Sequence, residues 1–172
     1  MARIQQQRII LGIDPGLAHT GWGVVSQQGA RLSCVAYGCI ETPSSWSLPD
    51  RLGKIYGQIA AVVNRYKPEC VSIETVWFGS NTTTAFATGQ ARGAALAACA
   101  GSVASFAEYS PKQIKLAIVG TGAAEKEQVE YMVQHLLQLE SKPQPDHAAD
   151  ALAAAICFVN FDVASFERLA SL

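Results

Sequence analysis

Three carboxylates stand in stretches of sequence that otherwise have the composition of a buried core. Asp14 ends the apolar run over residues 9–13. Glu74 lies inside the short apolar segment CVSIETV, and Asp150 is flanked by alanines. Burying a carboxylate without a partner is costly, so each acid should be paired, protonated or bound to a cation. Asp14 by itself fits a turn cap before Pro15-Gly16 equally well, so the interpretation depends on what the fold places beside it.

The order of the predicted strands brings two of these acids to one end of a sheet. Two strands and a helix separate the run before Asp14 from the segment 70–76 that carries Glu74. A strand reached through a helical crossover lies parallel to its neighbour, about 4.8 Å away. Two bare carboxylates at about 4 Å repel by roughly 4 kcal/mol at an effective dielectric of about 20. A divalent cation such as magnesium or manganese removes that cost.

The remaining elements predict an α/β fold with a mixed five-stranded sheet and helices on both faces. Alternating or continuous apolar residues predict strands, and apolar residues at helical spacing predict helices. Ser47, followed by Pro49 and Asp50, has the pattern of a capped helix start. Strands are expected over residues 9–13, 20–26, 30–41, 70–76 and 102–109, and helices over residues 48–66, 80–100, 111–119, 125–139 and 146–159.

The last predicted helix carries polar residues near its start. His147 and Asp150 are three residues apart, and Asp146 and Asp150 are four apart, so either pair shares a helix face. An acid in the first turn stabilises a helix through its dipole, which accounts for Asp146. Asp150 lies one turn deeper among alanines, where that explanation fits less well.

The helix expected over residues 80–100 is built largely of alanine and glycine. Glycine costs about 1 kcal/mol in a helix interior, so Gly89 and Gly93 predict that another surface packs against them. That surface is either the sheet or a partner subunit. Arg92 is the cation in the middle of this helix.

Length and composition predict one domain over residues 1–160, followed by a C-terminal tail over residues 161–172. The 172 residues are 49% apolar, which supports a substantial core. No apolar run approaches the length of a membrane span, and the polar N-terminus does not resemble a signal peptide. The five cysteines have no metal-binding spacing and are interpreted as reduced core residues. These features predict a cytoplasmic protein.

Acids from two adjacent strands and a helix suit two-metal hydrolysis of a phosphodiester, in which the ions clamp the attacking water and the leaving oxygen. Five motifs follow one another along the chain, at Ile10–Val24, Ile73–Trp77, Gly89–Gly93, Val119–Val129 and Pro145–Ile156. With these motifs the chain resembles RuvC-type Holliday junction resolvases of the RNase H-like superfamily over residues 9–158. Five motifs in order are far more specific than any one of them. The resemblance implies a magnesium-dependent endonuclease that resolves Holliday junctions during recombination and repair.

The resemblance implies four positions that bind metal and catalyse cleavage. Asp14, Glu74 and Asp150 match three of them directly. The fourth lies three residues before Asp150, which assigns His147, with Asp146 as the alternative if the helix register differs by one. Neutral imidazole can bind a metal or act as a general base. The resemblance further implies two Mg²⁺ per active site, with Mn²⁺ able to substitute, and products with 5′-phosphate and 3′-hydroxyl ends.

An aromatic residue after Glu74 is implied to stack on unpaired bases at the crossover. Trp77 matches it and Phe78 assists. Stacking of a base on an aromatic ring is worth roughly 1–3 kcal/mol. Packing of both rings into the core is the structural alternative, but Gly79-Ser80 directly behind them favours an exposed loop.

The resemblance also implies that several basic residues contact DNA phosphates. Lys115 and Lys126 match family positions, and Lys112 and Arg92 extend the stripe. A net charge of −1 argues against a uniformly basic nucleic-acid binder and is compatible with such a local stripe. Ser80 stands where some relatives carry lysine, which predicts a weaker basic surface.

The implied partners follow from the symmetry of the substrate. A four-way DNA junction has two strands to cut, which suits a C2 homodimer with the helix over 80–100 at its interface. A RuvA–RuvB branch-migration complex is the further implied partner.

Two alternatives to the endonuclease function stay open. The stretch 14–21 also resembles the phosphate loop of actin-like kinases, which need a second domain, and a module that holds junctions would bind without cutting.

Overall fold

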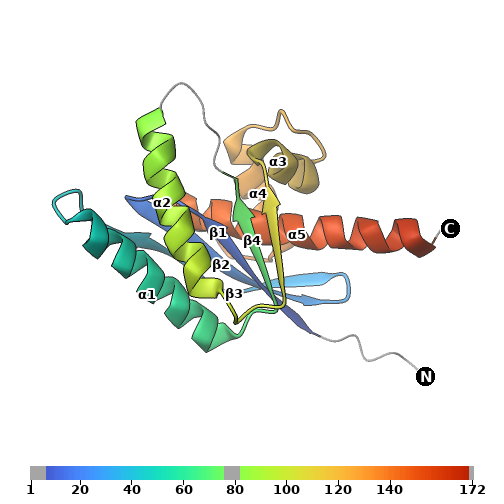
Figure 1. Ribbon diagram of the computed structural model, residues 1–172. Helices are drawn as coiled ribbons and strands as arrows, with labels where there is room; N and C mark the ends of the chain where they lie inside the picture. Colours follow the sequence, from blue (N-terminus) through green and yellow to red (C-terminus); the bar gives the residue numbers. More distant parts are fainter. Residues whose placement is uncertain (1–6, 76–81, 171–172) are drawn as a thin grey trace.

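The computed structural model describes residues 7–75 and 82–170, with residues 162–170 as backbone only. Five strands in this part of the chain form one mixed sheet in the order β3-β2-β1-β4-β5, with helices on both faces (Figure 1). This is the predicted α/β architecture of the RNase H-like fold. The strands are β1 (Arg8–Asp14), β2 (His19–Gln28), β3 (Arg31–Glu41), β4 (Cys70–Glu74) and β5 (Ser105–Tyr109).

Helices α1 and α2 cover one face of the sheet, and α5 crosses the other with α3 and α4 beside it (Figure 1). No helix within the described ranges has both the length and the hydropathy needed to cross a bilayer. The helices are α1 (Leu48–Tyr66), α2 (Thr82–Cys99), α3 (Pro111–Val119), α4 (Lys126–Leu136) and α5 (Asp146–Ala170).

Helices α1 and α3 have the predicted bounds, and the other three helices differ at one end or at both. The Ser47 side chain accepts a hydrogen bond from the Asp50 amide at the start of α1, as expected. Helix α4 ends three residues before the predicted end because the backbone at Gln138 enters the left-handed region with φ 55°. Helix α5 continues beyond Val159 to Ala170, since no glycine or proline interrupts that stretch.

The side chains of β1 alternate between the two faces of the sheet. Leu11 and Ile13 belong to the core shared with α1 and α2, whereas Ile10 belongs to the core shared with α5. Gly12 lies against the α5 backbone. The same alternation places Asp14, at the end of the strand, on the α5 side.

The parallel pairing of β1 with β4 confirms the predicted crossover. Ile13 pairs with Ile73 at the last paired position, and the next residues along the two strands are Asp14 and Glu74. Ser72, two residues before Glu74, donates a hydrogen bond of 2.6 Å to the Ala154 carbonyl of α5. Glu74 therefore faces α5, as Asp14 does.

Glycines in the strands allow the α5 backbone to touch the sheet. A Cβ built on Gly12 would lie 1.9 Å from the Ala151 carbonyl oxygen, and one on Gly23 would lie 2.7 Å from the Leu152 side chain. A Cβ on Gly21 would lie 1.8 Å from the carbonyl oxygen of His147. Any side chain at these positions would push α5 away, so the glycines set the height of this helix above the sheet.

The small residues of α2 divide into a covered face and an open one. Ala91, Ala95 and Ala98 are buried in the core shared with α1. No atom of the described chain lies within 4 Å of a Cβ built on Gly89 or Gly93. Of the two surfaces that the sequence left open, the sheet does not pack against these glycines, because the helix turns its alanines inward.

The cysteines are free thiols distributed through the fold. Cys70, Cys99 and Cys157 are buried, whereas Cys34 and Cys39 on β3 are partly exposed. Three of the five cysteines therefore lie in the core, as predicted.

Candidate active site

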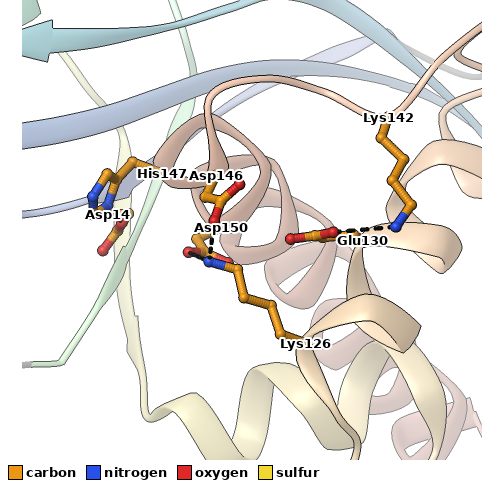
Figure 2. Close-up of polar contacts among 7 residues, drawn as sticks. All are labelled: Asp14, Lys126, Glu130, Lys142, Asp146, His147 and Asp150. Atoms are coloured by element: carbon orange, nitrogen blue, oxygen red, sulfur yellow. Dashed lines mark hydrogen bonds and ion pairs between the residues drawn. The ribbon is translucent and has the colours of Figure 1, made fainter.

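Asp14, His147 and Asp150 lie together where the end of β1 meets the first turn of α5. One potential ligand atom from each residue lies within 4.8 Å of those of the other two. Figure 2 shows Asp14 directly beside His147, with Asp150 one turn further along the helix. The spacing of three residues between His147 and Asp150 puts both on the helix face that Asp14 meets.

The His147 ring is held at one edge by Asp14. Its Nδ1 lies 2.7 Å from Oδ2 of Asp14. This hydrogen bond raises the pKa of His147, and the negative charges of Asp14 and Asp150 act in the same direction. When Nδ1 carries the proton and donates it to Asp14, Nε2 keeps a lone pair that can accept a proton or bind a cation.

Glu74 lies at the edge of this trio. Burial, and then the charges of Asp14 and Asp150, raise the pKa of Glu74 from its ordinary 4.5 to about 7. Glu74 and Asp150 also line one cavity of about 220 Å³ beneath α3 and α4. The predicted acids of the two strands, Asp14 and Glu74, thus interact electrostatically. Among the described residues, the group whose ligand atoms lie within 4.8 Å of one another is Asp14, His147 and Asp150, without Glu74.

The pKa of Asp150 is raised for the same reasons as that of Glu74. Burial raises its pKa, and the charge of Asp14 adds to that rise. Lys126 opposes the rise, since its ammonium lies 3.7 Å from Oδ2 of Asp150. A cation on α4 therefore relieves part of the negative charge of the site.

Asp146 points to Lys126 and not to the trio. Its Oδ2 lies 2.9 Å from Nζ of Lys126, and this hydrogen bond lowers the pKa of Asp146. Figure 2 shows Lys126 reaching from α4 to the acids of α5, with the Glu130–Lys142 pair to one side. Of the two residues considered for the fourth position, His147 is the one that joins Asp14 and Asp150.

The donor set fits a hard divalent cation. Two carboxylates and an imidazole converge, and a third carboxylate stands nearby. The pKa values of Glu74 and Asp150 are raised first by burial and then by the neighbouring carboxylates, and a bound cation would oppose both effects. Carboxylate-rich sites with open positions suit Mg²⁺ and Mn²⁺. These residues could hold such an ion.

The predicted DNA-contacting residues fall into different surroundings. Lys115 and Lys126 line the cavity of Glu74 and Asp150. The aliphatic part of Lys112 lies against Gly122. Arg92 is paired with Glu108 across α2 and β5. Trp77 and Phe78, predicted to stack on bases, lie outside the described residues.

Two residues of the site were not identified from the sequence. His19, at the start of β2, stacks on the ring of His147 and lines a groove of about 400 Å³ with it. An exposed histidine at a strand end has no distinctive pattern. Gly21 lies within a predicted strand and has no pattern of its own, whereas its missing side chain admits the His147 carbonyl.

Comparison with known proteins agrees with this geometry. The profile of a family described as "Crossover junction endodeoxyribonuclease RuvC" matches residues 10–158. The chain belongs to the RuvC family. The family member from Rubrobacter xylanophilus is 48% identical over 153 residues, covering 89% of this chain and 86% of the relative. The one from Heliobacterium modesticaldum is 50% identical over 149 residues, covering 87% and 92%.

A solved structure of this RuvC family has the same fold. The structure of Thermus thermophilus RuvC in complex with Holliday junction substrate matches with a TM-score of 0.85 at 35% identity, covering 90% of this chain and 94% of that one. Membership in the RuvC family confirms the resemblance stated from the five motifs. It also excludes the actin-like kinase alternative for the stretch 14–21.

Proposed function

We propose that this protein is a structure-selective endonuclease that cuts four-way DNA junctions by paired, divalent-cation-dependent cleavage of phosphodiester bonds. The observation that carries the proposal is the convergence of Asp14, His147 and Asp150 within 4.8 Å, with Glu74 as the next residue in register on β4. The names of the relatives add the substrate class, since they are crossover junction endodeoxyribonucleases. A module that only bound junctions would have no need of these acids.

Asp14, Glu74, His147 and Asp150 would hold two Mg²⁺, for which Mn²⁺ could substitute. When bound, the ions would polarise the scissile phosphate and lower the pKa of water. The protein contributes rigid placement, because the glycines under α5 fix the distance between His147 and β1. It also contributes repulsion among the acids, which makes the site favourable for positive charge.

Nδ1 of His147 is hydrogen-bonded to Asp14, so the one lone pair at Nε2 would serve either to bind the cation or to orient the attacking water and accept its proton. The water oxygen would bond to phosphorus as the bond from phosphorus to O3′ breaks, and the leaving O3′ would take up a proton from solvent. The products then carry a 5′-phosphate and a 3′-hydroxyl. General-base assistance of this kind contributes about 10²–10⁴-fold to rate.

Basic side chains on the α3 and α4 side would hold the DNA backbone over the acids. Lys115 and Lys126 line the cavity next to Glu74 and Asp150, so they would meet phosphates that flank the cut. Lys112 and Arg92 would extend this surface, with Trp77 and Phe78 stacking on unpaired bases. Each phosphate contact makes binding more sensitive to salt.

The chain would act as a C2 homodimer, which matches the two-fold symmetry of the junction. The open side of α2 is the proposed interface. Phe86 is 67% exposed there, and it shares a helix face with Gly89 and Gly93. Glycines let two helices approach closely, and an exposed aromatic supplies the area to bury. A RuvA–RuvB branch-migration complex is the further proposed partner.

The test is cleavage of a synthetic four-way junction with and without Mg²⁺, for the wild type, His147→Ala and Asp146→Ala. Cleavage should require the cation and should fall by about 10²-fold or more in His147→Ala. Asp146→Ala should retain most activity, because Asp146 pairs with Lys126 outside the trio. Equal loss in both variants would refute the assignment of His147, and the absence of any cleavage would refute the function.

A further inference from the structure

We propose that His19 is a positioning residue that holds the imidazole of His147 in place. The proposal rests on the cleavage function above. The His19 and His147 rings are stacked, with centroids 5.3 Å apart and an angle of 6° between their planes. Both values are those of an offset aromatic stack, which is a favourable arrangement for two rings.

Hydrogen bonds on both sides of His19 restrain the backbone that carries it. The Thr20 hydroxyl donates a hydrogen bond of 2.7 Å to the Gly16 carbonyl, and the Thr42 amide donates one of 2.9 Å to the Ala18 carbonyl. The His19 carbonyl occupies the space that a side chain on Gly16 would need, at 2.4 Å. The exposed His19 ring therefore stands on a turn with little freedom to move.

The His147 ring needs such support. Its side chain is 43% exposed, although Gly21 fixes its backbone against β2. Two contacts restrain the ring in the described part of the chain, the Asp14 carboxylate at one edge and His19 on one face. Asp14 is also a candidate metal ligand. A carboxylate that engages a cation is a weaker acceptor for imidazole, so the stack with His19 supplies a restraint that does not depend on Asp14.

The experiment compares His19→Ala, which removes the stack, with His19→Phe, which keeps a ring but no nitrogen. The first readout is the His147 imidazole C–H resonances in the metal-free protein, which a stacked ring shifts. The second is kcat and KM for a synthetic four-way junction in Mg²⁺. His135→Ala is the matched control, since it removes another exposed histidine ring, which contacts Tyr131 of α4 with ring centroids 3.9 Å apart and planes tilted by 35°.

His19→Ala should move the His147 resonances and lower kcat about threefold to tenfold, with KM unchanged. His19→Phe should restore both, and His135→Ala should change neither. Wild-type kcat with unmoved His147 resonances in His19→Ala would overturn the proposal. So would a His19→Phe variant as impaired as His19→Ala, because a nitrogen and not the stack would then matter. If the wild type cut no junction, the proposed function would fail, and the metal-free resonances would still decide whether His19 holds His147.

Discussion

Glycines on the two sides of this molecule have opposite surroundings. Gly12, Gly21 and Gly23 lie in strands under α5, where atoms of the helix fill the space of the missing side chain. Gly53 on α1 and Gly89 on α2 have no described atom within 4 Å of that space. The first set brings two backbones into contact and thereby locates a reactive site. The second set leaves a surface open for something outside the subunit.

The contrast explains why the chemistry lies under α5. Side chains between α1, α2 and the sheet keep those elements apart, and slight shifts there are absorbed by flexible side chains. Under α5 the backbone itself is the contact, so His147 and Asp150 have little freedom relative to Asp14. A catalytic group displaced by about 1 Å can lose 10²-fold in rate, which makes such rigidity useful.

The largest effect is expected from removing one charge on the α5 side. Asp14→Asn should lower junction cleavage by a factor on the order of 10³, because the trio loses the carboxylate that joins β1 to α5. Junction affinity should not fall, since repulsion of phosphate decreases. A gel cleavage assay and a binding titration on the same junction measure both quantities.

Asp50→Asn on α1 is the matched control, and this variant should cleave the junction normally. Full cleavage by Asp14→Asn would mean that the site lies elsewhere.

The next effect comes from filling the space under the start of α5. Gly21→Ala places a methyl group where the His147 carbonyl now lies, at 1.8 Å. The helix must shift, which should cost roughly 1–3 kcal/mol in unfolding free energy and about 10²-fold in kcat. Chemical denaturation and the cleavage assay test this.

Gly53→Ala is the matched control for that variant, because it adds the same methyl group to open space on α1. It should stabilise the protein by about 0.5–1 kcal/mol through helix propensity. If Gly21→Ala and Gly53→Ala lowered the unfolding free energy equally, the contrast between the glycines under α5 and those on α1 and α2 would be refuted.

A third variant tests whether the open side of α2 meets a second copy. Phe86→Asp should weaken the homodimer by about 10–100-fold, since burial of a phenylalanine is worth about 1.5–3 kcal/mol. Sedimentation over a concentration series measures the change. Leu116→Asp, at a 50% exposed position on α3, should leave the dimer intact. A wild type that stays monomeric at high concentration would contradict the proposed interface.

The smallest effect is on stability in the absence of metal. The pKa of Glu74 is about 7 in the folded protein and near its ordinary 4.5 in the unfolded chain. The folded state therefore holds the extra proton between these values, and stability falls as pH rises through this window. The raised pKa values of Asp150 and His147 act in the same direction. In EDTA, Tm should decline between pH 5 and pH 8.

Glu74→Gln removes the Glu74 part of that decline and should raise Tm at pH 8 by a few degrees, about 2–4 °C per kcal/mol. Thermal melts of the two proteins across this pH range measure the difference. If Tm declined with pH equally steeply in both proteins, Glu74 would not be a cause of the decline. Mg²⁺ should flatten the wild-type slope, because a cation that binds the folded state stabilises it.

The sequence predicted the fold and the acids of the site because both leave local patterns. A strand, a helix and a second strand imply a parallel pair, and so Asp14 and Glu74 could be placed at neighbouring strand ends. Helical spacing placed His147 and Asp150 on one face. Each of these inferences uses residues close in sequence or a topological rule with few exceptions.

The parts that could not be predicted depend on contacts between distant segments. Lys126 pairs with Asp146 only because the connection over 137–145 folds α4 back beside α5. The stack of His19 on His147 joins two residues that carry no shared pattern. Gly21 in a strand and Gly89 in a helix are both glycines within regular elements, and only the arrangement of the helices makes one position filled and the other open.

The bond between His147 and Asp14 spans 133 positions of the chain. Strand β1 is synthesised early and α5 late, so the reactive centre cannot assemble until most of the polypeptide has left the ribosome. At about 5–20 residues per second, synthesis of 133 residues takes about 7–27 seconds. A nascent chain halted before α5 would carry Asp14 and Glu74 without their helix partners, and it could not nick nearby DNA. The candidate site is thus complete only once α5 has packed on the sheet.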